Sequence, residues 1–520
     1  HLKKLSTPYL IGAAILLAIP AFLIHLGLIA FIGDEGIRSL VAFEMGKSGN
    51  FIVPTLNGAF YFNKPPLFNW MVYGMSSLFG YFGEWPARVT SLVGLAVFAI
   101  VVYRFVSVYI NKTAGVTLAL MTITSGRILF WDSMLGLIDI WFSAAVYLNM
   151  MVLFHFGKSG RWRSMFLFSY LLFSAAFLLK GLPAVVFQGI SILTALVLFK
   201  QVKRKFLSPD HIGMALIGVI PAALYYVLYA RSVSLEHVFA ILTDQSLQRT
   251  ATHHGFGKTV IHLFTFPLEQ FYHFLPWTFL GILFFHPKFR TWLRENEFVR
   301  FNFWMLVANL PVYWLSVQVY PRYLLMFIPL FNLVGYYILQ RSLETSEKWR
   351  KMIHAGLIAM ASLGTIMVLL MLVYPPARSL PGILWVWIGS SVLLLICFAG
   401  LITDRRRMLI WMCLALMVVR CSFDLVVLPL RSSSFPENAC REDIRRSANN
   451  HPNQTWLIYG DTETHQVARF YSSIYTDQII HKTSTIGDST ALYLVDRQLY
   501  RDFPGIKVDS ILLERRQVLA

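Results

Sequence analysis

Residues 164–199 read SMFLFSYLLFSAAFLLKGLPAVVFQGISILTALVLF, which is two apolar runs joined by the short turn Lys180-Gly181-Leu182-Pro183. A helix needs about 20 mainly apolar residues to cross a bilayer, so runs of this kind are typical of spanning helices. A helix also satisfies its backbone polar groups within its own segment, as the interior of a membrane requires. The stretch therefore predicts two neighbouring membrane helices with a tight turn between them, and it places Lys180 at the membrane edge.

The composition extends this prediction to the whole chain. Of the 520 residues, 56% are hydrophobic and only 14% are charged, whereas soluble domains carry about 25% charged residues. The 45 Lys and Arg residues exceed the 27 Asp and Glu residues, which gives a net charge of +18. These basic residues stand in short clusters between apolar runs, a pattern typical of membrane topology rather than of nucleic-acid binding. We expect an integral membrane protein without a nucleic-acid partner.

Thirteen apolar runs are predicted to be membrane-spanning helices. They cover residues 8–32, 86–107, 113–131, 137–156, 164–179, 181–199, 212–230, 260–286, 301–318, 323–340, 352–374, 382–402 and 408–430. If the N-terminus is cytoplasmic, the Lys and Arg clusters fall in every second connection, as the positive-inside rule requires. The expected fold is mainly α-helical, with the C-terminal region on the extracytoplasmic side.

Two domains are expected from the hydropathy. Residues 1–430 form the transmembrane domain, with long outer loops at 33–85 and 231–259. In the first loop, RSLVAFEMGKSG has the apolar spacing of an amphipathic surface helix. Residues 431–520 are predicted to form a small extracytoplasmic α/β domain. Its expected strands are TWLIYGD, ALYLVD and DSILLER, and its expected helix is TETHQVARFYSS.

Acidic residues at the expected outer boundary are the first candidates for chemistry. Asp34 and Glu35 are adjacent at the end of the first apolar run, and two such carboxylates can ionise differently, so that one serves as a base. The alternative is that these two carboxylates only terminate the first helix where it reaches water. Asp132 and Asp139 are seven residues apart, which puts both on one face of a helix. A structural ion pair with Arg127 is the alternative for these two.

Basic residues on the same side are candidates for binding an anion. Lys64 precedes two prolines, Arg249 lies in the second outer loop, and Arg322 is followed by Tyr323. An Arg between tyrosines at this level suits a lipid phosphate, although interfacial anchoring accounts for the same pattern. Of the remaining side chains, His253 and His254 are weak metal candidates, because adjacent histidines rarely chelate one ion together.

The sequence of the first outer loop resembles that of a known family. The stretch 33–80, GDEGIRSLVAFEMGKSGNFIVPTLNGAFYFNKPPLFNWMVYGMSSLFG, is similar to the GT-C glycosyltransferases, most closely to the protein mannosyltransferase and lipid A aminoarabinose transferase group. Members carry an Asp-Glu pair after helix one, a Lys-Pro-Pro-Leu stretch, an Arg near the start of helix two, an Asp opening helix four and a Lys-Gly-Pro turn. The matching residues are Asp34-Glu35, Lys64-Pro65-Pro66, Arg88, Asp132 (with Asp139 as the alternative) and Lys180-Gly181-Leu182-Pro183.

One departure from the family concerns a metal. Aminoarabinose transferases have an acidic residue just before the Lys-Pro pair, and that residue helps to bind a metal ion, whereas this chain has Asn63. The resemblance therefore implies no certain cofactor, and Asn63 argues against a divalent metal at this position.

The resemblance implies transfer of a sugar from a polyprenyl-phosphate donor to a lipid, glycan or protein acceptor on the outer face of a membrane, expected to be the bacterial inner membrane, with inversion. Asp34 would be the general base, and Glu35 would position the acceptor or tune Asp34. The donor phosphate would be bound by Lys64, Arg249 and Arg322, with Tyr323 beside them. The supporting residues would be Arg38, Arg88, Asp132, Asp139 and Lys180. A transporter or flippase of a lipid-linked sugar is the alternative function.

Overall fold

The computed structural model describes residues 7–234, 236, 256–316, 318–345, 347–462, 464–487, 490–496 and 498–511. The elements of its first part are α1 (Thr7–Leu23), α2 (Asp34–Ser48), β1 (Thr55–Leu56), β2 (Ala59–Phe60), α3 (Leu67–Phe79), α4 (Glu84–Tyr109), α5 (Lys112–Ile123), α6 (Gly126–Phe130), η2 (Asp132–Met134), α7 (Asp139–Lys158), α8 (Trp162–Lys180) and α9 (Leu182–Leu198).

The middle of the chain is also helical. Its elements are α10 (Val202–Lys205), α11 (Pro209–Gly218), α12 (Ile220–Tyr229), α15 (Phe256–His273), η3 (Trp277–Phe285), α16 (Phe289–Glu295), α17 (Glu297–Asn309), α18 (Pro311–Trp314), η4 (Pro321–Leu324), α19 (Phe327–Thr345) and α20 (Glu347–Leu369).

The last part combines helices with three strands. Its elements are η5 (Met371–Val373), α21 (Pro375–Arg378), α22 (Ile383–Thr403), η6 (Arg405–Arg407), α23 (Met408–Ser422), the π turn η7 (Phe423–Val427), α24 (Leu428–Ser432), α25 (Pro436–Asn450), β3 (Trp456–Tyr459), α26 (Gln466–Thr476), β4 (His481–Thr483) and β5 (Leu492–Leu494).

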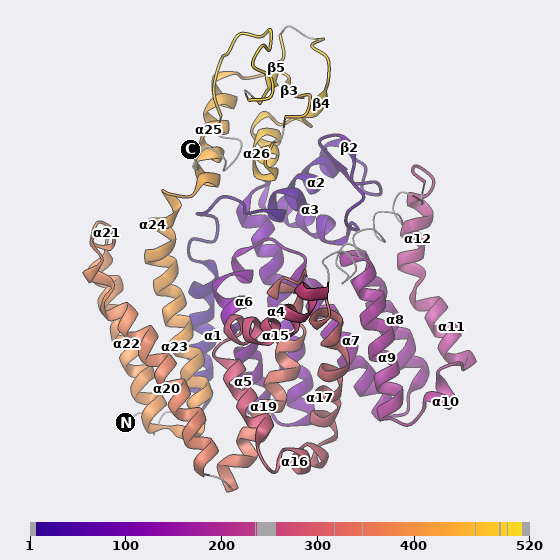
Figure 1. The fold of residues 1–520 in the computed structure, drawn as a ribbon, viewed down its shortest axis with the longest axis vertical. Coiled ribbons are helices and arrows are strands. Elements are labelled where there is room, and N and C mark those ends of the chain that lie inside the picture. The colour runs from indigo at the N-terminus through magenta and orange to yellow at the C-terminus, as the bar shows by residue number, and fades with distance from the viewer. Residues whose placement is uncertain are drawn as a thin grey trace.

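The described helices form a tall bundle with a smaller cap (Figure 1). Six of them are long and apolar enough to cross a membrane, and two bent pairs, α5 with α6–η2 and α11 with α12, raise the number to eight among the described residues. Several predicted spans are shorter or broken. The run 8–32 is helical only to Leu23, and the run 260–286 divides into α15 and η3. Thirteen spans therefore stay a prediction.

The predicted hairpin at 164–199 is confirmed. Helix α8 ends at Lys180, Gly181 has a φ of +77°, and α9 begins at Leu182 with Pro183 in its first turn. Glycine reaches this backbone region without the steric penalty of a side chain, and proline is tolerated in the first helical turn because its missing N–H has no partner there.

The first long loop differs from the surface helix expected for it. Helix α2 forms, but every residue from Glu35 to Met45 is buried, including Arg38 and Glu44. Glu44 accepts hydrogen bonds from the Thr55 hydroxyl at 2.7 Å and from the Asn57 backbone N–H at 2.6 Å, which ties α2 to the β1–β2 hairpin. Desolvation by burial raises the pKa of Glu44. Two of the three charged residues in the predicted surface helix, Arg38 and Glu44, are therefore buried, and only Lys47 is exposed.

The cap is built by the C-terminal part of the chain, shown in yellow at the top of Figure 1. Strands β3, β4 and β5 form a parallel sheet in the order β4-β3-β5, and Ala448 of α25 and Tyr475 of α26 pack against its apolar side chains. The predicted strands at TWLIYGD and ALYLVD and the predicted helix at TETHQVARFYSS are present. The strand predicted at DSILLER is not: residues 509–511 are not extended in the sheet, and the remainder lies outside the described residues. Strand β4 was not predicted.

Candidate functional site

Asp34 is the first residue of α2 and stands at the N-terminal end of that helix. Gly33 precedes it with a φ of +56°, a backbone conformation that favours glycine. The side chain of Asp34 is 45% exposed, and its Oδ2 is 3.1 Å from Nη2 of Arg322. The partial positive charge at a helix N-terminus also favours a carboxylate there. The carboxylate is therefore held in place and still accessible.

Arg322 joins Asp34 to a second carboxylate. Its Nε lies 3.4 Å from Oδ2 of Asp139, the first residue of α7. The guanidinium also stacks on the Tyr320 ring, with 4.7 Å between its carbon and the ring centroid, and lies 5.7 Å from the Tyr323 ring centroid. Because Arg322 belongs to η4, this pairing brings together segments almost 290 residues apart in the sequence.

Lys180 completes this cluster from the end of α8. Its Nζ is 2.5 Å from Oδ1 of Asp139 and 3.8 Å from the centroid of the Tyr323 ring. The residue is only 7% exposed, so it is a buried ion-pair partner and does not reach out to the membrane surface. Lys64 lies near enough to Asp139 to interact with it electrostatically. We call Asp34, Asp139, Lys180 and Arg322 the charged cluster.

Asp132 and Asp139 have different surroundings. The prediction that they share one face of a helix is wrong, because Asp132 belongs to η2 and the chain leaves the helical conformation before α7 begins at Asp139. Asp132 is buried and pairs with Arg127, whose Nε lies 3.3 Å from its carboxylate. The family pattern has an Asp at the start of a membrane helix. In this structure Asp139 is the first residue of α7, and it is Asp139, not Asp132, that belongs to the charged cluster.

Glu35 points away from Asp34 into the protein. It is fully buried, and Arg88 contacts both carboxylate oxygens, with Nε and Nη2 at 3.0 and 3.1 Å. The carboxylate also accepts the backbone N–H groups of Ile32 and Gly136 at 2.9 and 2.7 Å. With four hydrogen-bond donors already on its carboxylate, Glu35 has little room to contact the acceptor substrate. This geometry favours a role in anchoring the surrounding backbone over the role in positioning the acceptor substrate that the resemblance implied.

Arg88 fixes the segment just before Asp34, which we call the α1–α2 linker (residues 24–33). Its Nη1 donates to the carbonyls of Leu26 and Ile29, and its Nη2 to that of Ala30, at 2.6, 2.8 and 3.2 Å. These hydrogen bonds hold the backbone of the α1–α2 linker in place, which agrees with the supporting role predicted for Arg88. Arg38, one helical turn after Asp34, is also buried, and its guanidinium lies over the Tyr61 ring at 5.6 Å.

The cap holds the same linker from the other side. The Tyr471 hydroxyl donates to Oε1 of Glu84 at 2.5 Å and accepts the backbone N–H of Phe31 at 3.0 Å. Arg441 pairs with Glu84 at 2.7 Å, and Asn438 accepts the backbone N–H of Ala30 at 2.6 Å. Burial and the neighbouring Glu84 carboxylate raise the pKa of the Tyr471 hydroxyl well above its usual value, so it stays a donor. No local pattern in the sequence marks Tyr471, Glu84, Arg441 or Asn438 as partners of this linker.

Replacing Tyr471 with phenylalanine tests this clamp. Tyr471→Phe removes the acceptor of the Phe31 N–H and a donor to Glu84, and a buried polar group without a partner costs about 1–3 kcal/mol. We therefore expect a lower thermal unfolding midpoint in detergent. The matched control is Tyr475→Phe on the same helix, whose hydroxyl has no hydrogen bond among the described residues. Equal midpoints for the two variants would contradict the clamp.

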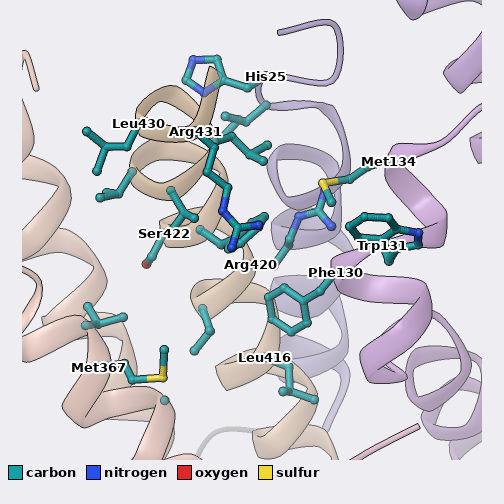
Figure 2. Close-up of a pocket in the computed structure, with 18 of the residues that line it drawn as sticks. His25, Phe130, Trp131, Met134, Met367, Leu416, Arg420, Ser422, Leu430 and Arg431 are labelled. Carbon is teal, nitrogen blue, oxygen red and sulfur yellow. The ribbon is translucent and has the colours of Figure 1, made fainter. Parts of the chain in front are cut away.

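A large pocket lies under the α1–α2 linker (Figure 2). Its volume is about 830 Å³, and its walls come from the linker, from Phe130 to Met134, from α20 and from the helix formed by α23, η7 and α24. Most lining side chains are apolar. Arg420 also lines it but is buried and paired with Asp424 at 2.7 Å. Lys64, Lys180 and Arg322 do not line this pocket.

Three predicted residues lie outside the described part of the chain: Arg249, His253 and His254. Among the described residues, no group of three or more His, Cys, Asp and Glu side chains could hold a metal ion. Asn63 is exposed beside Lys64, and its amide is a weaker metal ligand than the carboxylate of the family pattern. The described residues therefore offer no fit for the metal that the family pattern would place here.

Both the sequence and the structure are similar to known proteins. The profile of the family described as dolichyl-phosphate-mannose-protein mannosyltransferase matches residues 63–235. The structure is similar to that of ArnT from Cupriavidus metallidurans bound to undecaprenyl phosphate, with 19% identity, a TM-score of 0.70, and coverage of 93% of this chain and 87% of that chain. For apo ArnT the values are 17%, 0.64, 91% and 85%. No curated protein matches the sequence at a significant level.

These likenesses cover the parts of the chain that carry the site. The matched profile includes Lys64, Arg88, Asp139 and Lys180. The structural likeness to ArnT extends over 93% of the chain, well beyond the residues that the profile matches. The chain therefore has the same membrane-type GT-C fold as ArnT, as the resemblance of its motifs implied.

Proposed function

We propose that this chain is an inverting membrane glycosyltransferase that uses a polyprenyl-phosphate sugar as donor and acts on the extracytoplasmic side. The observation that carries the proposal is the charged cluster, in which an accessible carboxylate, Asp34, lies 3.1 Å from a cation, Arg322. Such a pair supplies both a base and a partner for a departing anion. The ArnT structure with bound undecaprenyl phosphate supports a lipid-phosphate donor on the same fold.

In the proposed reaction, Asp34 accepts the proton of an acceptor hydroxyl while that oxygen attacks the anomeric carbon of the sugar. The bond between the anomeric carbon and the phosphate oxygen breaks, and its electron pair leaves with the polyprenyl phosphate. One displacement inverts the configuration. The phosphodiester linkage already activates the sugar, so no nucleotide is consumed.

Arg322 and Lys180, the cations of the charged cluster, and the nearby Lys64 offset the charge that grows on the leaving phosphate. The guanidinium of Arg322 is planar and can bind phosphate through two N–H groups, whereas the two lysines act as point charges. Asp139 contacts both Arg322 and Lys180, at 3.4 and 2.5 Å. We propose that it fixes their positions, so that they need no rearrangement as the transition state forms. Arg249 stays a proposed phosphate ligand on sequence grounds.

A donor labelled in both sugar and lipid tests the function. Purified protein in lipid nanodiscs, incubated with the polyprenyl-phosphate sugar and a membrane extract as acceptor source, is expected to release free polyprenyl phosphate and to place the label on an acceptor. Mass spectrometry follows both products. The alternative function, a transporter of the lipid-linked sugar, would move the donor across proteoliposomes and leave it intact. Translocation without free polyprenyl phosphate would overturn the proposal.

A further inference from the structure

The pocket beneath the α1–α2 linker is built along a membrane span. Its lining runs from Met412 on α23 to Arg431 on α24, within the apolar span Arg405–Ser432. The 19 residue-to-residue steps from Met412 to Arg431 correspond to about 28 Å of helical rise, close to the thickness of a hydrocarbon layer of about 30 Å. The cavity is therefore long enough for the extended hydrocarbon chain of a lipid.

The pocket opens toward the surroundings of the helices. Leu363 and Met367 on α20 line it and are still 62% and 64% exposed. Both lie in the apolar span Lys348–Val373. At that depth the medium outside the protein is lipid, so a hydrocarbon chain can enter from the side without crossing water. The opposite wall includes Phe130 and Trp131 (Figure 2).

One cation marks the end of this pocket. Arg431 is the last residue but one of the span Arg405–Ser432, which puts it at head-group depth. Figure 2 shows its side chain extending from α24 toward the pocket. Within the described ranges no ion pair or hydrogen bond engages its guanidinium, unlike that of Arg420, which pairs with Asp424. A guanidinium at this level is suited to a lipid phosphate.

We propose that this pocket binds an anionic two-chain phospholipid, with acyl chains along α20 and α23 and the phosphate at Arg431. The occupant is distinct from the polyprenyl donor, because none of Lys64, Lys180 and Arg322 lines the pocket. Five lining residues belong to the α1–α2 linker: Ile24, His25, Leu26, Ile29 and Ile32. The bound lipid therefore packs against the segment that leads into Asp34. The proposal concerns binding and does not depend on the proposed activity.

The experiment measures lipid binding to the full chain by native mass spectrometry. Delipidated protein is titrated with phosphatidylglycerol or phosphatidylcholine of identical acyl chains. We expect tighter binding of phosphatidylglycerol. Arg431→Gln should weaken that binding about fivefold without changing phosphatidylcholine binding, and Arg431→Lys should retain most of the preference. Leu416→Trp, which fills the pocket, should weaken the binding of both lipids.

Two matched controls separate the pocket from general effects. Arg378→Gln removes an exposed arginine outside the pocket, and Leu393→Trp adds the same indole to an exposed position of α22 outside it. Neither should change lipid binding, and size-exclusion profiles check folding. Equal binding of the two phospholipids, or unchanged binding by Arg431→Gln, would overturn the proposal. Displacement of the bound phospholipid by undecaprenyl phosphate in the wild-type chain would instead identify the pocket as the donor groove and would also overturn it.

Discussion

Asp34→Asn is expected to lower the rate of sugar transfer by roughly 10²- to 10⁴-fold, because a positioned general base contributes about that much. The amide keeps the size of the side chain and can still accept a hydrogen bond from Arg322, which is 3.1 Å from Oδ2 in the wild type. It cannot accept the proton of the acceptor hydroxyl. The measurement is the single-turnover release of free polyprenyl phosphate from labelled donor, with excess enzyme.

The matched control for this variant is Asp477→Asn. Asp477 is also an accessible aspartate paired with one cation, at 2.6 Å from Lys47, and it lies in the cap rather than in the charged cluster. Both variants should show wild-type thermal unfolding, and only Asp34→Asn should lose transfer. Donor binding, followed by co-purification of labelled donor, should persist in Asp34→Asn. Transfer at the wild-type rate in that variant would remove Asp34 as the base.

Local sequence signals predicted the local parts of this structure well. The turn at Gly181 and the helix at Gln466–Thr476 each depend on residues within a few positions of one another. Glycine and proline positions and period-3.6 apolar spacing encode such features directly. The GT-C fold was recognised because its motifs also stand in a fixed order along the first 185 residues.

What the sequence did not reveal depends on contacts between distant segments. The burial of α2 follows from the packing of α26 and α3 against it, and no pattern within α2 records that. Asp34 is accessible and its neighbour Glu35 is buried, because Glu35 forms an ion pair with Arg88 from α4 and Asp34 forms one with Arg322 from η4. Tyr471 and Glu84 are 387 residues apart. Neither residue stands in a sequence pattern that identifies its hydrogen-bond partner, because the two meet only in the folded chain.

Arg322→Gln should lower kcat by about 10²- to 10³-fold, because it removes a preorganised donor to the charge that develops on the leaving phosphate. The loss should appear in kcat more than in KM, since the interaction strengthens as the bond to the sugar breaks. Arg322→Lys should recover part of the rate, because lysine keeps the charge but not the two-point grip. The exposed Arg378→Gln is the control, and steady-state kinetics at varied donor concentration give both constants.

A double-mutant cycle then tests how Arg322 is held. Asp139 Oδ2 lies 3.4 Å from Arg322 Nε, and its other oxygen is 2.5 Å from Lys180. If Asp139 acts by positioning Arg322, then Asp139→Asn should cost much activity in the wild type and much less in the Arg322→Gln background, where the group that it positions is absent. The residual effect in that background measures what Asp139 does through Lys180. Strictly additive losses would mean that the two residues act independently, and Asp139 would then require a role of its own in the reaction.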